Sequence, residues 1–229
     1  MQQQPHPYAQ ALLQQFSRHA NPQIAEPMAK YMRNLFAFYG IKSPERIALT
    51  RQFLRENGTP ALPHLEPVIV TLWQAPQREA QYAALDILER MVKHLTPVHL
   101  PLLEQLVTEK SWWDTVDYIA TRIVGRLLLR FPTEIARITG NWMNSGNMWL
   151  QRTAILFQLG YGQKTDIGLL LTYINQCTPS KEFFIQKAIG WALREYSKTN
   201  PQWVQQVVAQ TPLAPLSKRE ALKWLQRKG

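Results

Sequence analysis

The chain has 229 residues, 45% of them hydrophobic and 18% charged, and 26 Lys and Arg against 16 Asp and Glu give a formal net charge of +10. This balance excludes a disordered polycation, and 10 Gly with 16 Pro exclude a low-complexity or collagen-like chain. The single cysteine, Cys177, excludes a disulfide scaffold and a Cys-rich zinc module and is expected to be a structural thiol.

We expect no targeting signal in the N-terminal residues. Met1–His6 lack the basic and apolar regions of a signal peptide, and no apolar run approaches the ~20 residues of a membrane span. We therefore expect a cytosolic protein whose Gln-rich residues 1–7 are disordered.

Apolar residues recur at spacings of three and four along the chain, which predicts an all-α protein of short helices. Glycine and proline predict where the helices break. The breaks fall at Gly40–Pro44, Asn57–Pro60, Leu62–Pro63, Ala75–Pro76, Thr96–Pro97, Phe131–Pro132, Asn144–Gly146, Thr178–Ser180, Asn200–Pro201 and Pro212–Pro215.

The breaks are periodic. Helix starts are predicted 34 to 37 residues apart at Ser43, Gln77, Ser111, Ser145, Ser180 and Ser217, and the serines are expected to cap the helices. A period of this size with two helices per unit is typical of an α-solenoid, in which stacked neighbours bury each other's apolar faces. We expect about six repeats in one domain over residues 1–229.

Positive charge is concentrated in the second part of the chain. Residues 1–110 hold 11 basic and 9 acidic side chains (+2), whereas residues 111–229 hold 15 and 7 (+8). A clustered basic charge indicates a polyanionic partner, of which nucleic acid is the commonest and an anionic lipid surface the alternative.

A helix over residues 181–198 would place Trp191 among three cations. On a helical wheel Lys187, Trp191, Arg194 and Lys198 lie within about 60° of one another, opposite an apolar stripe that includes Ile185 and Ile189. The usual interpretation of a tryptophan is core packing, but burial of this face would also bury Lys187 and Arg194.

The segment Ser111–Asp117 divides its two tryptophans in the same way. Trp113 lies one helical turn before Asp117, whereas Trp112 lies on the apolar side with Ile119. An indole and a carboxylate are thus predicted to share one surface. Asp114 is interpreted as stabilising the helix N-terminus.

Further cations extend this polar face. Arg152 lies opposite Leu150 and Phe157, and Arg219, Lys223 and Arg227 follow at intervals of four on the last predicted helix. Taken singly, each could be a solvated charged face. Together they predict a basic track on the concave side of the solenoid, which would follow a phosphate backbone.

One carboxylate in a basic track weakens DNA binding unless something positive lies beside it. A cationic nucleobase would supply that positive charge, because indole faces attract cations and a carboxylate stabilises an oxocarbenium ion. The pattern therefore predicts cleavage of the N-glycosidic bond of a cationic base.

The residues that carry this chemistry lie in long segments that closely resemble the AlkD family of bacterial DNA alkylpurine glycosylases. The resemblance covers nearly the whole chain and is carried by Ala25–Arg33, Ser111–Asp117, Met148–Gln158, Ser180–Tyr196 and Leu213–Ala221. It implies HEAT-like repeats that hold alkylated duplex DNA, and base excision repair by release of 3-methyladenine, 7-methylguanine and bulky cationic adducts. It implies no metal, no cofactor and no deep pocket for a flipped base.

The resemblance also implies roles for single residues. Asp117 would be the catalytic carboxylate, Trp113 and Trp191 aromatic walls, Arg152 and Arg194 phosphate contacts, and Tyr31 an aromatic of the same cleft. Lys187, Lys198, Arg219 and Lys223 are predicted DNA contacts from the wheel. The chain has Leu159–Lys164 where the family has more lysine, which leaves a phosphate contact in the loop 160–164 open.

The alternative is a non-catalytic solenoid that binds nucleic acid or an acidic protein, with the tryptophans as interface anchors. A membrane-surface role is disfavoured, because the basic face has few large apolar side chains. The five histidines lack metal-site spacing and are expected at the surface. We expect a monomer in the bacterial cytosol and nucleoid.

Overall fold

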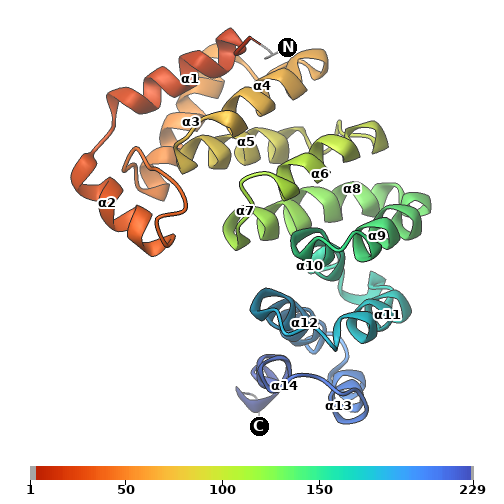
Figure 1. Cartoon of the computed structure of the whole chain (residues 1–229). Coiled ribbons are helices and arrows are strands. Elements are labelled where there is room, and N and C mark those ends of the chain that lie inside the picture. Colours follow the sequence, from red (N-terminus) through yellow and green to blue (C-terminus); the bar gives the residue numbers. More distant parts are fainter. Residues whose placement is uncertain (1–3, 228–229) are drawn as a thin grey trace. The chain divides into compact units, whose positions relative to one another are not determined.

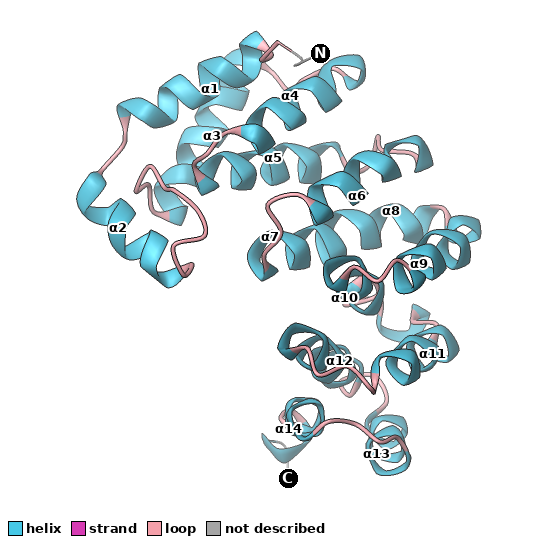
Figure 2. Cartoon of the chain, viewed as in Figure 1, coloured by secondary structure: helices cyan, strands magenta, loops and turns pink. Residues whose placement is uncertain are grey.

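The computed structural model describes residues 4–227, and within that range it contains helices and no β-strand (Figure 1, Figure 2). The prediction of an all-α helical repeat protein is therefore confirmed. Contacts divide the chain into two compact units, residues 1–94 and residues 95–229. That these two units form a single domain over residues 1–229 stays a prediction. None of the helices in the described range is long and apolar enough to cross a membrane.

The first unit contains five α-helices in its described residues, and its core includes Leu12, Phe16, Leu65, Ile69 and Leu72. Helix α1 packs on α3 and α4, and α5 packs on the same two helices. The helices are α1 (Pro7–Arg18), α2 (Pro22–Tyr31), α3 (Ser43–Asn57), α4 (Leu62–Gln74) and α5 (Arg78–Met91).

The start of α1 lies within the segment expected to be disordered. The disorder predicted for residues 1–7 falls partly on residues 1–3, which lie outside the described residues. His6 caps α1 by accepting a hydrogen bond from the backbone N–H of Tyr8, and Pro7 is the first helical residue. A capping side chain and a proline at the first position both favour helix initiation here, and the disorder expected for residues 1–7 stays a prediction.

A buried carboxylate shapes the loop between α2 and α3. Glu79 accepts hydrogen bonds of 2.9 to 3.1 Å from the backbone N–H groups of Tyr39, Gly40 and Ile41. A Cβ at Gly40, whose φ is +86°, would lie 2.0 Å from the carbonyl oxygen of Asn21. Only glycine fits this approach, which explains the break predicted at Gly40.

The second unit contains the remaining helices. One continuous helix runs from Trp113 to Arg130 and includes a π-helical turn, Ile119–Val124, between its two α-helical parts. The helices are α6 (Leu100–Thr108), α7 (Trp113–Tyr118), α8 (Gly125–Arg130), α9 (Ile135–Asn144), α10 (Met148–Leu156), α11 (Ile167–Cys177), α12 (Phe183–Tyr196), α13 (Pro201–Gln210) and α14 (Pro215–Leu222). Short 3-10 turns cover Pro97–His99, Pro132–Glu134, Gly162–Lys164 and Leu225–Arg227.

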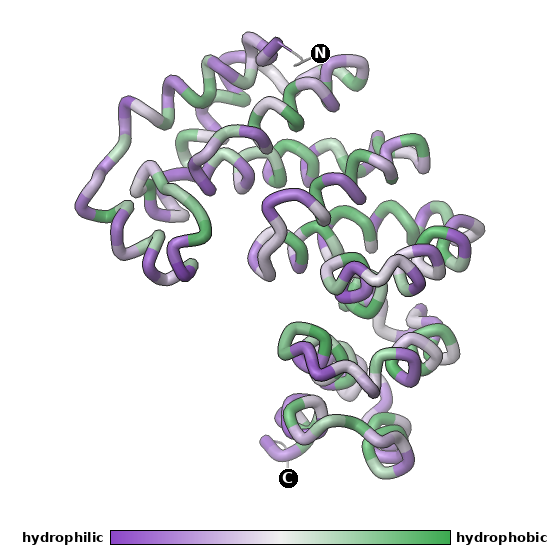
Figure 3. Tube along the Cα trace, viewed as in Figure 1, coloured by the Kyte–Doolittle hydropathy of each residue, from purple (hydrophilic) through white to green (hydrophobic). Residues whose placement is uncertain are grey.

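The repeat has a more regular period than predicted. Five helices begin 35 residues apart, as from 43 to 78, at Ser43, Arg78, Trp113, Met148 and Phe183. Hydrophobic and hydrophilic stretches alternate along these helices (Figure 3), as expected where one side of each helix is buried. With this period, Asp117, Arg152 and Lys187 each occupy the fifth position of their helix.

The predicted serine caps are wrong. Ser111 and Ser145 lie ahead of the next helix, and their hydroxyls donate to carbonyls of the preceding one. Ser217 lies inside α14 and donates to the carbonyl of Gln186. The side chains that cap helices of this unit are Asn147, Asp166 and Asn200, which are equally suited to accept from first-turn amides.

Helices α12 and α14 approach closely at Gly190. A Cβ on this residue would lie 2.5 Å from Cβ of Glu220 and 2.9 Å from the carbonyl oxygen of Ser217. A side chain larger than hydrogen would push the two helices apart. The contact places Glu220 of α14 directly against the helix that carries Lys187, Trp191 and Arg194.

Candidate active site in the second unit

A pocket of about 370 Å³ lies between α7, α10, α12 and α14. It brings together six of the predicted site residues, namely Trp113, Asp117, Arg152, Lys187, Trp191 and Arg194. Three further residues of its lining were not predicted from the sequence, namely Phe183, Phe184 and Glu220.

Asp117 is held by Arg152, and both side chains line the pocket. Nε of Arg152 donates to Oδ1 of Asp117 at 2.6 Å, and Nη2 donates to Oδ2 at 2.8 Å. This bidentate geometry fixes the carboxylate plane. The side chain of Asp117 keeps 14% of its surface exposed and that of Arg152 only 5%, so the accessible group of the pair is the carboxylate.

The position of Arg152 corrects the prediction that it lies on an exposed phosphate track. Besides Asp117, its guanidinium donates to the backbone carbonyl of Phe184 and lies 5.9 Å from the centre of the Phe184 ring. The helical wheel of α10 placed Arg152 away from the core of its own repeat, but α7 and α12 cover that face. Arg152 therefore ties three helices together instead of presenting a free cation.

An aromatic cluster lies behind this pair. The rings of Trp112, Trp149 and Phe184 lie 4.9 to 5.9 Å apart, centre to centre, in tilted and edge-to-face arrangements. Trp112 is half-buried there, in agreement with its predicted packing role. Trp149 and Phe184 are the second residues of α10 and α12, so the 35-residue repeat was the signal that could have identified Phe184.

Two indoles remain available at the pocket. Trp113 is 36% exposed, and Trp191 is partly exposed on the face of α12 opposite the buried Ile185 and Ile189. Among residues 4–227, no ring or cation stacks on either indole. Both keep a face that a ligand can cover, as the wheel predicted.

The environment of Asp117 affects its protonation. Burial raises the pKa of the Asp117 carboxyl above its usual value, while the hydrogen bonds and charge of Arg152 oppose that rise. A charged species entering the pocket therefore meets a carboxylate that has lost much of its water. Its electrostatic effect on such a species is greater than in bulk solvent.

Glu220 forms ion pairs with three of the predicted DNA-binding cations. Its buried carboxylate lies 3.1 Å from Nζ of Lys187 and 3.0 Å from Nη1 of Arg194, and it also accepts from Nζ of Lys223. The three cations keep 31% to 41% of their side-chain surface exposed. The three-residue spacing of Glu220 and Lys223 could have predicted their ion pair. The helical wheel of α14 could not show that α12 would cover Glu220.

The remaining predicted contacts lie outside this pocket. Lys198 is exposed and pairs with Glu195 at 2.7 Å, and Arg219 is exposed and forms no ion pair with any described residue. Tyr31 is 75% exposed at the end of α2 in the first unit. The single helix predicted for Arg219, Lys223 and Arg227 is wrong, because α14 ends at Leu222 and Arg227 belongs to a separate 3-10 turn.

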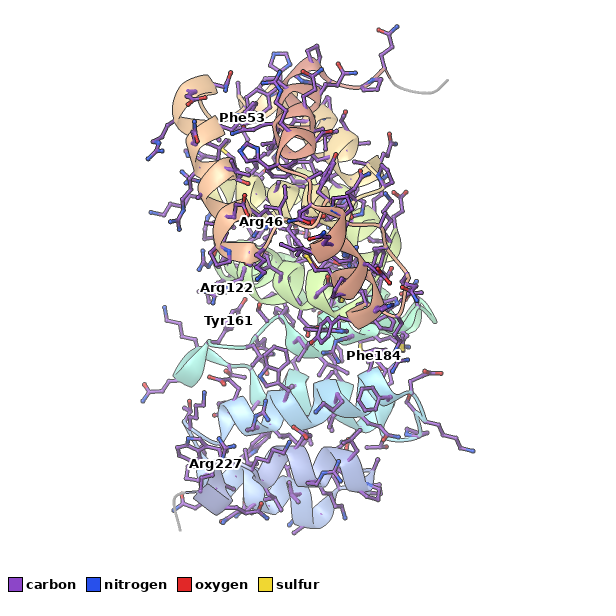
Figure 4. The ribbon with its side chains drawn as sticks, turned by 90° about the vertical axis from the view of Figure 1, so that its left-hand side faces the viewer. Arg46, Phe53, Arg122, Tyr161, Phe184 and Arg227 are labelled. Carbon is purple, nitrogen blue, oxygen red and sulfur yellow. The ribbon has the colours of Figure 1, made fainter. Side chains whose placement is uncertain are left out.

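Trp191 also lines a second hollow. Its lining includes Arg122, Arg126 and Tyr161, and Figure 4 shows Arg122 and Tyr161 in the same region of the unit. The Tyr161 hydroxyl donates to the carbonyl of Gly125 and anchors the start of the 160–164 loop. Lys164 of that loop is exposed, and its predicted phosphate contact stays open.

Side chains suited to metal binding do not gather in the described part of the chain, where no three His, Cys, Asp or Glu residues form a cluster. Cys177 is buried, and burial raises the pKa of its thiol to about 11. The thiol therefore stays protonated near neutral pH and serves as a structural group, as predicted. The predicted surface positions of the histidines agree with the structure, in which all five are at least partly exposed.

Residues 12–225 match the sequence model of a family described as DNA alkylation repair enzyme. The chain belongs to this family. It is also 38% identical to a predicted DNA alkylation repair enzyme from Enterococcus faecalis, whose solved structure matches with a TM-score of 0.84 over 90% of this chain and 96% of that one. No curated protein matches the chain.

Membership of the DNA alkylation repair family confirms the resemblance seen in the sequence and supports a role in DNA repair with DNA as the substrate. The matched range contains every residue of the pocket.

Proposed function

We propose that this protein is a monomeric DNA glycosylase that hydrolyses the N-glycosidic bond of cationic N3- and N7-alkylated purines in duplex DNA. Its substrates would include 3-methyladenine, 7-methylguanine and bulky cationic adducts. The supporting observation is the Asp117 carboxylate, oriented by Arg152 and partly exposed in a pocket with two unstacked indoles. The protein would start base excision repair in the cytosol.

The chemistry needs little beyond these groups. Alkylation at N3 or N7 gives the purine a positive charge, so the base leaves with the electron pair of the C1′–N bond and becomes neutral. The sugar then carries oxocarbenium character, which Asp117 stabilises electrostatically while it orients the water that attacks C1′. The water loses one proton to solvent, and the products are the free purine and an abasic site.

The other residues have binding roles in this proposal. The indoles of Trp113 and Trp191 cover the sugar and the charged base through cation–π attraction. Arg194, Lys187, Lys198, Arg219, Lys223 and Tyr31 contact the DNA. Arg152 has a different role from the phosphate contact predicted from sequence, since its two hydrogen bonds orient Asp117.

Purine release from methylated duplex DNA tests the proposal. We expect wild-type protein to release 7-methylguanine in single turnover, and Asp117→Asn to be slower by about 10²-fold or more, the usual effect of losing one preorganised electrostatic group. Duplex binding should be kept or strengthened, because Asn removes a negative charge from a basic surface. A Glu134→Gln variant removes a negative charge that pairs with Arg137 outside the pocket, and it should release 7-methylguanine at the wild-type rate.

Two outcomes would contradict the proposal. Equal release of uracil and 7-methylguanine would show that the positive charge of the base is not used. DNA binding without any purine release by the wild type would favour the non-catalytic solenoid, in which the Asp117–Arg152 pair only joins helices.

A further inference from the structure

The charges around the pocket raise a problem for a cationic substrate. Three cations line the pocket, Arg152, Lys187 and Arg194. Asp117 balances Arg152 through the bidentate pair. Without another carboxylate, Lys187 and Arg194 would stand uncompensated on both sides of Trp191, the indole proposed to cover a positively charged base.

Glu220 supplies the missing charge. Its side chain is 4% exposed, and its two oxygens divide between the neighbours, with Oε1 next to Lys187 and Lys223 and Oε2 next to Arg194. Burial alone would raise the pKa of Glu220, but hydrogen bonds from Lys223 and Lys187 outweigh it and hold the pKa below its usual value. Glu220 is therefore ionised at neutral pH.

The same contacts control where the cations point. Lys187 and Arg194 lie one helical turn before and after Trp191, within reach of its indole. The structure instead draws both toward Glu220, and neither forms a cation–π contact with Trp191. The glycine at position 190 permits this, because α14 can approach close enough to place Glu220 beside α12.

On the basis of the proposed function, we infer that Glu220 is a positioning residue for substrate charge. It tethers Lys187 and Arg194 away from the Trp191 face and offsets their charge, so the pocket accepts a positively charged purine and sugar while the exposed parts of these cations still attract DNA. With Glu220 the five charged groups of the pocket sum to +1, and without it to +2. Selectivity for cationic lesions then depends on a residue that need not contact the lesion.

The test compares wild type with Glu220→Gln on two probes. One duplex contains a cationic pyrrolidine abasic-site analogue and the other contains the neutral tetrahydrofuran analogue. We expect wild type to bind the cationic duplex more tightly, and Glu220→Gln to reduce this preference about 10-fold with little change for the neutral duplex. Its single-turnover release of 7-methylguanine should fall by a similar factor, less than the ~10² to 10³ of a direct electrostatic group.

A charge-compensated variant separates this role from a structural one. Glu220→Gln combined with Lys187→Gln restores the pocket sum to +1, so we expect it to recover most of the lost cationic preference, although it removes a second hydrogen-bonding group. Helical circular dichroism reports whether each variant is folded. Because Lys187→Gln also removes a DNA contact, the double variant is judged by the ratio of its affinities for the cationic and neutral duplexes. Glu134→Gln, which also removes one negative charge, is the matched control.

The outcomes are distinct. Normal purine release and unchanged cationic preference in Glu220→Gln would overturn this inference and leave the proposed function intact. Equal losses for both duplexes, not rescued by Lys187→Gln, would also overturn it and assign Glu220 a structural role. No purine release by wild type would contradict the proposed function itself.

Discussion

Asp117 and Arg152 occupy the same position in successive repeats, and stacking of the repeats turns this equivalence into an ion pair. A buried pair is stabilising only when its geometry offsets the loss of hydration. Here both carboxylate oxygens and three guanidinium nitrogens are satisfied within the protein. The pair can therefore hold an ionised carboxylate in place before any substrate binds, which reduces reorganisation during catalysis.

The pH dependence of purine release should reflect this carboxylate. The pKa of Asp117 is raised, and the ionised form is the active one, so the rate should fall as pH decreases through a midpoint above the ordinary pKa of an aspartate. Because Arg152 lowers the pKa of Asp117, Arg152→Gln should move this midpoint to higher pH and reduce the rate at neutral pH.

Single-turnover release measured between acidic and neutral pH checks this prediction. The rate for Asp117→Asn is subtracted at each pH, because alkylated purines are also lost without enzyme. An acid limb that is the same in wild type and Arg152→Gln would show that Asp117 is not the titrating group.

The helices are joined at places where only glycine fits. Gly125 and Gly190 are both helical, and a Cβ would lie 2.3 Å from the carbonyl oxygen of Phe157 in the first case and 2.5 Å from Cβ of Glu220 in the second. A π-helical turn, Ile119–Val124, lies immediately before Gly125. Such turns interrupt α-helices frequently at functional sites. Close approach of helices, rather than helix propensity, therefore explains these glycines.

A pair of glycine substitutions tests this account. Gly190→Ala should lower the free energy of unfolding by about 1 to 3 kcal/mol, because the added methyl group overpacks the α12–α14 contact. Gly140→Ala in α9 is the control, since its Cβ would meet nothing within 4 Å. It should raise stability by about 0.5 to 1 kcal/mol through helix propensity. Denaturant titration measures both, and equal effects would contradict the packing argument.

The excess of positive charge acts at longer range than any of these contacts. Residues 111–229 carry 15 basic and 7 acidic side chains, but ion pairs with Asp117, Glu195 and Glu220 already involve several of the cations predicted to bind DNA. Arg219 is exposed and forms no ion pair with any residue of the described range. Cations of this kind should contribute most of the counterion release on DNA binding.

The salt dependence of duplex binding measures this contribution. We expect the logarithm of the association constant to fall linearly with the logarithm of salt concentration, and Arg219→Ala to reduce the slope by about 0.9, the value for one phosphate contact. Arg137→Ala should leave the slope unchanged, because Arg137 lies on α9 and already pairs with Glu134. An unchanged slope for Arg219→Ala would exclude this residue as a phosphate contact.

The repeat and the faces of single helices could be read from the amino-acid order alone. Hydrophobic spacing depends on the geometry of a single helix. The helical wheels therefore correctly placed Trp113 and Trp191 on exposed faces and Ile185 and Ile189 on buried ones. The predicted helix start at Ser43 is correct, and the other five lie one to three residues from the observed starts. They differ because serine, asparagine and aspartate are all suitable caps and only backbone geometry distinguishes them.

The partners of the charged residues could not be read in this way. Arg152 meets Asp117 across 35 residues, and Arg194 meets Glu220 across 26, because helices from different repeats pack side by side. A wheel treats each helix as if its polar face met water, whereas α7, α10, α12 and α14 turn those faces toward one another. Cations that were predicted to form a free row are therefore paired, through packing between helices, with two carboxylates that line one pocket, Asp117 and Glu220.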